Sequence, residues 1–314
     1  MRRRSLLHGV VGGVGLLAGC TGAQDDQDSG TPTSMSTAGE PIQAAAESYQ
    51  TAIAEFRRYT GSLQQSGLQY SSETVKIALE DARESLEQAR DANPTDVQVA
   101  QIEYLATVAD AVEASAGGYG SLLTADEHVE LSLSYQSADR REATRDEIAA
   151  AKDAYQQAAE QLATGVEAVR TALDAGVELE TELRLVEWRQ RLEQSHKSAI
   201  ASTPAMEGFK HESEGRWAYN DGVAHVTEED YDDAQKRFSS SFQAFGRALD
   251  DYRTAESNAP PDYKQQLIER TCVIEGYYDA AEDAHAAATL YDDGEFRKGD
   301  DRFDQADKHL NRDC

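Results

Sequence analysis

From residue 41 onward, apolar side chains recur every three or four residues along the chain. One such stripe consists of Val75, Leu79, Ala82, Leu86 and Ala89, and another of Ile148, Ala151, Tyr155, Ala158, Leu162 and Gly165. This spacing places the apolar side chains on one face of an α-helix, with Glu, Asp, Gln and Arg on the other faces. No stretch has the two-residue alternation or the Val/Ile runs of a strand. The sequence therefore predicts an all-α fold.

Helix-breaking residues divide these stripes. Breaks are expected at Asn93-Pro94, Gly117–Gly120, Pro204, Asn258–Pro261 and Asp292–Gly294. Short connections favour antiparallel neighbours, so we expect about eight to ten helices paired as hairpins, several of them longer than about 20 residues. The helical body is expected over residues 41–314, and two subdomains meeting near residues 200–215 remain an open alternative.

A weak internal repeat accompanies the hairpins. Ala82, Leu86 and Ala89, followed by Pro94, resemble the second helix and closing proline of a tetratricopeptide repeat. The resemblance returns in Gly222, Tyr231, Ala234 and Phe238, with Gly222 expected in a first helix and Ala234 and Phe238 in a second. A similar pattern follows at a constant offset in Phe296, Gly299, Phe303 and Ala306. The Trp and Leu-Gly pair of that repeat are missing, and the units are spaced more widely than the usual length of about 34 residues. The predicted architecture is tetratricopeptide-like hairpins or, alternatively, an extended helical bundle.

The N-terminus carries the features of an export signal. Arg3-Arg4, followed by two Leu, resembles a twin-arginine signal, a route that carries folded substrates. Leu17-Ala18-Gly19-Cys20 resembles a lipobox, which implies that residues 1–19 are a signal peptide and that Cys20 takes a lipid. The alternative is an uncleaved signal anchor with Cys20 buried, but the apolar run Gly9–Gly19 is shorter than the roughly 20 residues of a membrane-spanning helix.

Residues 20–40 are expected to join the lipid to the body. The stretch after Cys20 is rich in Thr, Ser, Gly, Asp and Gln, and Met35 is its only large apolar residue. Such a composition cannot form a core and predicts a flexible tether. We therefore expect a protein anchored at the extracytoplasmic face of the cell membrane, with the membrane as a partner through the lipid on Cys20.

The charge balance argues against a nucleic acid partner and indicates a solvent of high salt concentration. With 58 acidic against 30 basic residues, the 314-residue chain has a formal net charge of −28. Nucleic acid binding needs a dense basic surface, so no nucleic acid partner is expected. Few Lys and many Asp and Glu resemble a secreted protein of a salt-in halophile, since salt screens the self-repulsion of such a surface. Together with the N-terminal motifs, the chain resembles a twin-arginine-exported haloarchaeal lipoprotein; an ordinary acidic extracellular protein is the alternative.

The two remaining cysteines are expected to pair. Cys272 and Cys314 lie at nearly equal distances along the chain from the break at Asp293-Gly294. In an antiparallel hairpin they would stand at the same level, about 30 Å from the turn. We predict a disulfide, which would persist outside the cell; two free thiols are the alternative.

No pattern of catalytic residues stands out. The sequence lacks a phosphate-binding loop, a G-x-S-x-G elbow, a C-x-x-C pair and an H-E-x-x-H helix. Two Glu-x-x-His pairs place a carboxylate and an imidazole on one helical face, as in carboxylate-bridged di-iron bundles, and are weak metal candidates: Glu193 with His196, and Glu282 with His285. Chance alone explains pairs of this kind, so we expect no metal and no cofactor.

Other polar and aromatic residues have simpler interpretations. His211, in a stretch that faintly resembles the motif of imelysin-like helical lipoproteins, is expected at a solvated helix position. The acidic cluster Glu228–Asp230 lacks the spacing of an EF-hand and is expected to be a solvated surface. Aromatic residues such as Trp188 and Tyr277 are expected to pack in the core.

The function expected from these features is binding rather than catalysis. We expect a non-enzymatic, lipid-anchored helical scaffold whose grooved surface binds another protein or a peptide, because stacked hairpins make extended binding surfaces. The alternative is a lipoprotein that binds a metal ion or a small ligand in its helical interior.

Overall fold

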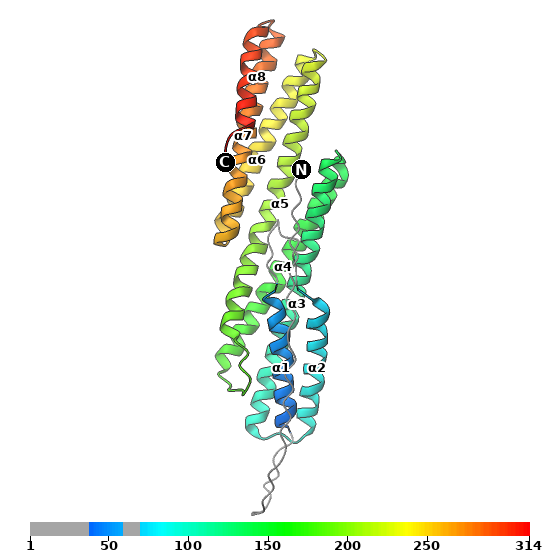
Figure 1. Cartoon of the computed structure of the whole chain (residues 1–314), viewed down its shortest axis with the longest axis vertical. Helices are drawn as coiled ribbons and strands as arrows, with labels where there is room; N and C mark the ends of the chain where they lie inside the picture. Colours follow the sequence, from blue (N-terminus) through cyan, green and yellow to red (C-terminus); the bar gives the residue numbers. More distant parts are fainter. Residues whose placement is uncertain (1–37, 59–69) are drawn as a thin grey trace, which may run out of the picture. The chain divides into compact units, whose positions relative to one another are not determined.

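The computed structural model describes residues 38–58 and 70–314, and these residues belong to one compact unit. In these ranges the chain forms only α-helices, as the apolar stripes predict (Figure 1). The eight helices are α1 (Gly39–Phe56), α2 (Ser72–Asp91), α3 (Asp96–Ser137), α4 (Arg141–Ala175), α5 (Leu185–Thr227), α6 (Tyr231–Asn258), α7 (Pro261–Asp292) and α8 (Phe296–Leu310). Five of them, α3 to α7, are longer than 25 residues.

Three of the predicted breaks are confirmed. Asn93-Pro94 separates α2 from α3, Ala259-Pro260 lies between α6 and α7, and Asp293–Glu295 lies between α7 and α8. At the first break Thr95 starts α3 with a capping box, in which its hydroxyl accepts the N–H of Gln98 and the Gln98 side chain accepts the N–H of Thr95. Such reciprocal bonds satisfy helix N–H groups that have no partner within the helix.

Two predicted breaks are wrong. Gly117–Gly120 lies inside α3, and Pro204 lies inside α5. Gly118 is used for close packing: a Cβ there would lie 2.6 Å from the Leu162 side chain of α4. Around Pro204, Ala199, Ala201 and Ala205 are buried, so packing on both sides of the proline stabilises a helix that the sequence alone would interrupt.

The start of the body also differs from the prediction. Helix α1 begins at Gly39, so Gly39 and Glu40 belong to the helix and not to the expected tether, and Pro41 lies in its first turn. Proline is tolerated there because the first N–H groups of a helix have no intrahelical partner. The remainder of the tether and the signal peptide lie outside the described residues.

Three hairpins close with the same turn. Between α3 and α4, α5 and α6, and α7 and α8, three residues connect the helices, and the middle one has a positive φ: Asp139 (52°), Glu229 (60°) and Gly294 (78°). In each turn the third residue donates its N–H to a carbonyl five residues earlier, at 2.8–2.9 Å. This is the 6→1 bond of a Schellman motif, which ends a helix by a left-handed residue. The hairpins therefore share one local design.

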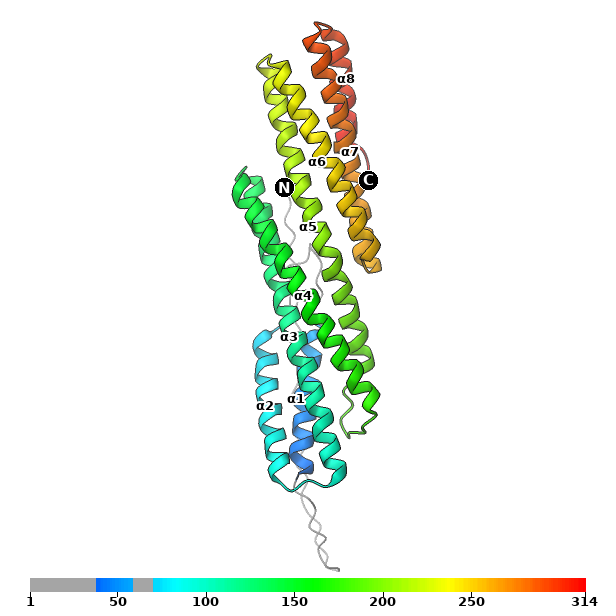
Figure 2. The same ribbon diagram turned by 180° about the vertical axis from the view of Figure 1, so that it is seen from behind.

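From α3 to α8, the helices pack mainly against their neighbours in the chain. Figures 1 and 2 show α6, α7 and α8 side by side, while α1 and α2 pack on each other and on the first part of α3. Ion pairs join α4 to α5, among them Arg141 with Asp221 at 2.7 Å and Lys152 with Glu207 at 2.5 Å. The result is an array of antiparallel helical hairpins.

Two hydrophobic clusters make up the core. In the first, α1, α3 and α5 contribute the stacked rings of Phe56, Tyr119 and Trp188, whose centroids lie 5.2 and 5.9 Å from that of Phe56. The second cluster lies between α5, α6, α7 and α8. Residues of both clusters occur on α5, with Met206 in the first and Ala205 in the second, within residues 200–215, near which a meeting of two subdomains is the open alternative. Helix α5 continues without interruption there, and a subdomain boundary stays a prediction.

Glycines on α5 face aromatic rings on α6. Gly208, Gly215 and Gly222 recur at seven-residue intervals, and a Cβ at each would lie 2.7–3.0 Å from a ring. The rings are those of Tyr252, Phe245 and Phe238, in that order. This close approach brings the backbones of α5 and α6 together and positions the buried side chain described next.

Candidate functional site

A carboxylate lies in the core of the second half of the chain. Glu212 of α5 is fully buried, midway between Gly208 and Gly215 on the side of α5 that faces α6. An isolated buried carboxylate would be strongly unfavourable, so its charge has to be compensated by neighbouring groups. Three helices supply them.

Glu212 accepts four hydrogen bonds. Arg216, one turn further along α5, donates Nε–H at 2.9 Å, and Tyr252 of α6 donates its hydroxyl at 2.9 Å. Arg270 of α7 donates both Nε–H, at 2.8 Å, and Nη2–H, one to each oxygen. Four bonds fill the acceptor sites of a carboxylate. The group thus cross-links α5, α6 and α7, and none of these acceptor sites is left for an acid–base role.

The partners of Glu212 are themselves held in place. Arg216 donates a bond of 2.6 Å to the Tyr277 hydroxyl, and its guanidinium lies 4.0 Å from the centre of that ring. Burial, and then the neighbouring Glu212 charge, raise the pKa of Tyr252 well above its ordinary value. Tyr252 therefore remains a neutral hydrogen-bond donor over the whole physiological pH range.

His211, next to Glu212, is not at a solvated position as the sequence predicts. Its side chain is 19% exposed, and Nδ1 lies 2.8 Å from Asp251 of α6. The close packing of α5 on α6 places this face of the helix against its neighbour. Glu212, which is not among the predicted site residues, and His211 thus both belong to the α5–α6 contact.

A groove lies between α6 and α7, beside the end of the chain. Its volume is about 470 Å³, and it is lined by Gly246, Leu249, Asp250, Arg253, Glu275, Tyr278, Asp279 and Arg312. Arg253 contacts Glu275 at 3.1 Å, and Arg312 contacts Asp279 at 2.5 Å. The lining offers hydrogen-bond donors from two arginines, acceptors from three carboxylates and the aromatic ring of Tyr278.

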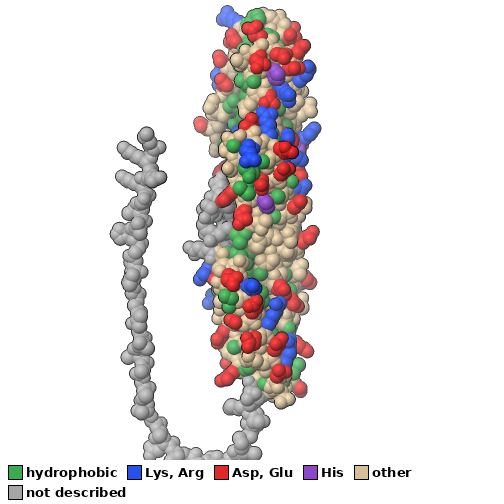
Figure 3. Space-filling view, turned by 90° about the vertical axis from the view of Figure 1, so that its right-hand side faces the viewer, with side chains coloured by type: hydrophobic (Ala, Val, Ile, Leu, Met, Phe, Trp, Pro, Cys, Tyr) green, Lys and Arg blue, Asp and Glu red, His purple; other side chains and the backbone are tan. Residues whose placement is uncertain are grey.

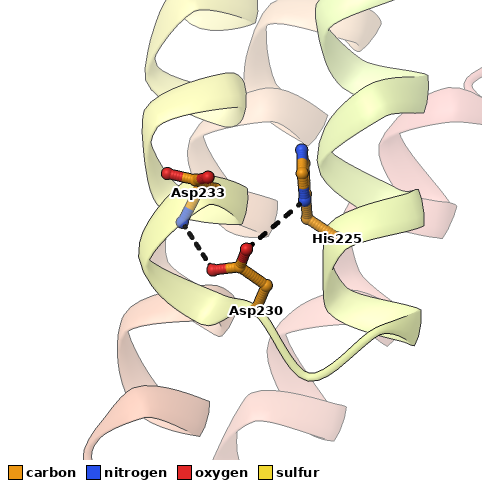
Figure 4. A group of neighbouring side chains, drawn as sticks. All are labelled: His225, Asp230 and Asp233. Atoms are coloured by element: carbon orange, nitrogen blue, oxygen red, sulfur yellow. Dashed lines mark hydrogen bonds and ion pairs between the residues drawn. The ribbon is translucent and has the colours of Figure 1, made fainter.

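A group of metal-ligand type lies at the turn between α5 and α6. His225, Asp230 and Asp233 bring one ligand atom each to within 4.8 Å of the others (Figure 4). In residues 38–58 and 70–314, this is the single group of three such side chains. The sequence predicts a solvated surface for the acidic cluster Glu228–Asp230, and no sequence pattern connects Asp230 with His225.

The two Glu-x-x-His pairs predicted as weak metal candidates lie on different helices. Glu193 and His196 lie on α5, where Glu193 pairs with Arg189 at 3.4 Å. Burial, with Lys197 adding to it, lowers the pKa of His196. Glu282 and His285 lie on α7. Within the described part of the chain, neither pair gains a third ligand.

The predicted pairing of cysteines is present. Cys272 of α7 and Cys314, four residues after α8, form a disulfide with their Cα atoms 5.9 Å apart. Gly276, one turn after Cys272, permits the approach, since a Cβ there would lie 2.6 Å from the His309 carbonyl oxygen.

The residues of the predicted export signal lie outside the described residues. They are Arg3, Arg4, Leu17, Ala18, Gly19 and the predicted lipidation site Cys20. None of the described helices combines the length and the apolar character that crossing a membrane requires.

No protein family, curated protein or solved structure matches this chain. Its function is therefore inferred from its own residues.

Proposed function

We propose that this protein is a non-enzymatic, lipid-anchored scaffold at the extracytoplasmic face of the cell membrane that binds another protein or a peptide. The observation that carries the proposal is the array of hairpins from α3 to α8, in which each helix packs mainly on its chain neighbours. Arrays of this kind leave extended faces free for binding, as tetratricopeptide and related solenoids do. The N-terminal motifs supply the proposed anchor.

The groove between α6 and α7 is the proposed binding place. Its arginines and carboxylates can exchange their mutual ion pairs for bonds to a polar peptide backbone or to charged side chains. Tyr278 adds an aromatic surface, and tyrosine is enriched where proteins bind one another. Elsewhere, acidic and basic side chains are dispersed over the face seen in Figure 3, which is typical of a solvated surface.

The test is affinity isolation from membranes at the native salt concentration, with the wild type compared with Arg253→Glu. This substitution reverses one charge in the groove, and Arg83→Glu provides a matched control, because Arg83 on α2 is similarly exposed and also pairs with a glutamate. We expect a partner that the wild type and the control retain and the groove variant loses. A partner retained equally by all three proteins would refute the groove, and failure to enrich any protein would refute the scaffold.

The proposed anchor has its own test. Cys20→Ser should move the protein from the membrane to the soluble fraction, and mass spectrometry of the wild type should find a lipid on Cys20. A Cys20→Ser protein that stays in the membrane would contradict the anchor without affecting the groove.

A further inference from the structure

We propose that His225, Asp230 and Asp233 form a binding site for one divalent transition-metal ion, with Zn²⁺ as the representative, at the turn between α5 and α6. The three side chains converge from the end of one helix and the beginning of the next (Figure 4). One imidazole and two carboxylates form the mixed nitrogen and oxygen donor set that zinc accepts, with water completing the coordination.

The imidazole is the observation that distinguishes this group from a merely acidic surface. Nδ1 of His225 is buried and has no hydrogen-bond partner, although buried nitrogens are normally bonded. The nearest carboxylate oxygen, Oδ2 of Asp230, lies 3.8 Å away, which is too far for a hydrogen bond. A metal ion between the two atoms would satisfy both of them.

The backbone holds two of the ligands in fixed positions. The N–H of Asp230 donates to the carbonyl of His225 at 2.9 Å, the 6→1 bond of the turn. The other carboxylate oxygen of Asp230 accepts the N–H of Asp233 at 3.3 Å and caps α6. Oδ1 of Asp230 is thus occupied by the backbone while Oδ2 faces His225, so the turn orients this carboxylate.

A movement of the exposed side chains is needed to bind an ion. Metal bonds of about 2.0–2.2 Å in a tetrahedral site place the ligand atoms about 3.4 Å apart. The three ligand atoms lie within 4.8 Å of one another, so the widest separation has to close by up to about 1.4 Å. Asp233 can make this movement, because its side chain is 48% exposed and, among the described residues, pairs with Lys236 alone, at 2.6 Å. The incoming ion would replace that ammonium group.

The surroundings favour a cation. Glu228, Glu229 and Asp232 lie in the same segment, are exposed and add negative charge around the site. Two positive side chains act on Asp233: Lys236, which pairs with it at 2.6 Å, and Arg237, which itself lies 3.9 Å from Asp221. Acidic surroundings alone would attract any cation weakly, whereas the buried imidazole nitrogen selects a transition metal over Mg²⁺ and Ca²⁺.

The experiment measures binding of Zn²⁺ to the full chain by isothermal titration calorimetry, after treatment with a chelator and dialysis into 1 M NaCl. At this salt concentration the Debye length is about 3 Å, so non-specific attraction is screened while coordination persists. We expect one Zn²⁺ per chain, and a loss of affinity of about a hundredfold in His225→Gln and in Asp230→Asn. Asn is also a good helix cap, so the second variant keeps the start of α6 intact.

Two controls separate coordination from general charge. Asp232→Asn removes the same charge as Asp230→Asn from a neighbouring exposed position and should leave the affinity unchanged. His196→Gln removes an imidazole elsewhere on α5 and should also have no effect. Thermal unfolding provides a second readout, in which Zn²⁺ raises the melting temperature of the wild type but not that of His225→Gln.

The proposal is overturned if His225→Gln binds Zn²⁺ as tightly as the wild type. It is equally overturned if Asp232→Asn weakens binding as much as Asp230→Asn does, or if Mg²⁺ competes with Zn²⁺ at equal concentration. These outcomes would leave the scaffold function untouched, because the turn between α5 and α6 contributes no residue to the groove.

Discussion

Replacing Glu212 by glutamine tests whether the buried carboxylate stabilises the contact of α5 with α6 and α7. Glutamine has the shape of glutamate, but its amide nitrogen donates hydrogen bonds instead of accepting them. Each Glu212 oxygen accepts a bond from an arginine: Oε1 from Arg216 and Arg270, Oε2 from Arg270 and Tyr252. In either orientation the amide nitrogen therefore faces at least one arginine N–H.

The expected cost follows from the number of bonds. If the amide nitrogen takes the place of Oε2, the Tyr252 hydroxyl can turn and accept from it, so one charge-assisted bond to Arg270 is lost. The remaining bonds from Arg216 and Arg270 then go to a neutral oxygen and are weaker. A hydrogen bond to a charged group contributes about 1.5–3 kcal/mol, so we expect Glu212→Gln to lower the free energy of unfolding by about 3 kcal/mol.

Urea unfolding at constant high salt, followed by circular dichroism, measures this difference. Glu214→Gln is the matched control: Glu214 lies two residues away on the same helix and pairs with Arg145 at 3.3 Å, but its side chain is 30% exposed. An exposed pair contributes about 0–1 kcal/mol, so the control should stay within that range. A Glu212→Gln protein within 1 kcal/mol of the wild type, or a control that loses as much, would refute the reasoning.

Three further predictions concern the disulfide, pH and salt. Changing both Cys272 and Cys314 to Ser should lower the free energy of unfolding by about 4 kcal/mol, because the bond closes a loop across a sequence separation of 42 residues. Urea unfolding with and without reductant measures the contribution of the bond. Equal urea midpoints for the wild type and the double variant without reductant would contradict a stabilising bond. Hydrogen bonding to Arg141 lowers the pKa of Asp221, so this pair stabilises the fold above the unfolded pKa near 4, and its contribution disappears as the pH falls through the lower folded value. The stability difference between the wild type and Asp221→Asn should accordingly shrink below about pH 4 in unfolding experiments across pH. A difference that stays constant as the pH falls below about 4 would contradict the assignment. Lowering the salt concentration should expand the protein, because its net charge of −28 is then less screened. Small-angle X-ray scattering measures the radius of gyration for this comparison. A radius of gyration that does not depend on salt would count against the halophilic interpretation.

Much of the fold follows from periodicity, while the exceptions depend on contacts between helices. Gly117–Gly120 has the composition of a turn, and only the packing of Gly118 on Leu162 explains why α3 continues. Conversely, the turns at Asp139 and Glu229 use acidic residues with positive φ, where sequence reasoning looks for glycine or proline. No sequence pattern marks the turn at Asp139, whereas the repeat pattern of Gly222, Ala234 and Phe238 predicts a boundary between two helices near Glu229, and Gly294 marks the turn of the third hairpin.

The buried Glu212 with its partners and the pair of His225 and Asp230 differ in how far the sequence predicts them. Glu212 continues the stripe of Gly208, Gly215, Tyr219 and Gly222 at alternating steps of four and three, which places a carboxylate at a core position. Its partner Arg270 comes from a distant helix, and no local pattern predicts it. His225 meets Asp230 only because the chain reverses between them, and the repeat pattern does not determine at which residues this turn lies.

The neighbour-to-neighbour packing of α3 to α8 also bears on how the protein folds. Contacts between consecutive helices join residues that are near one another in sequence compared with the length of the 314-residue chain, and such topologies favour rapid folding. Rapid folding suits a substrate that has to acquire its structure before it leaves the cytoplasm, as the proposed twin-arginine route requires. In such an array the terminal unit has a neighbour on one side only and opens most readily. The bond between Cys272 and Cys314 lies in that last hairpin, so after the proposed export it would close the end at which unfolding and proteolysis would otherwise begin.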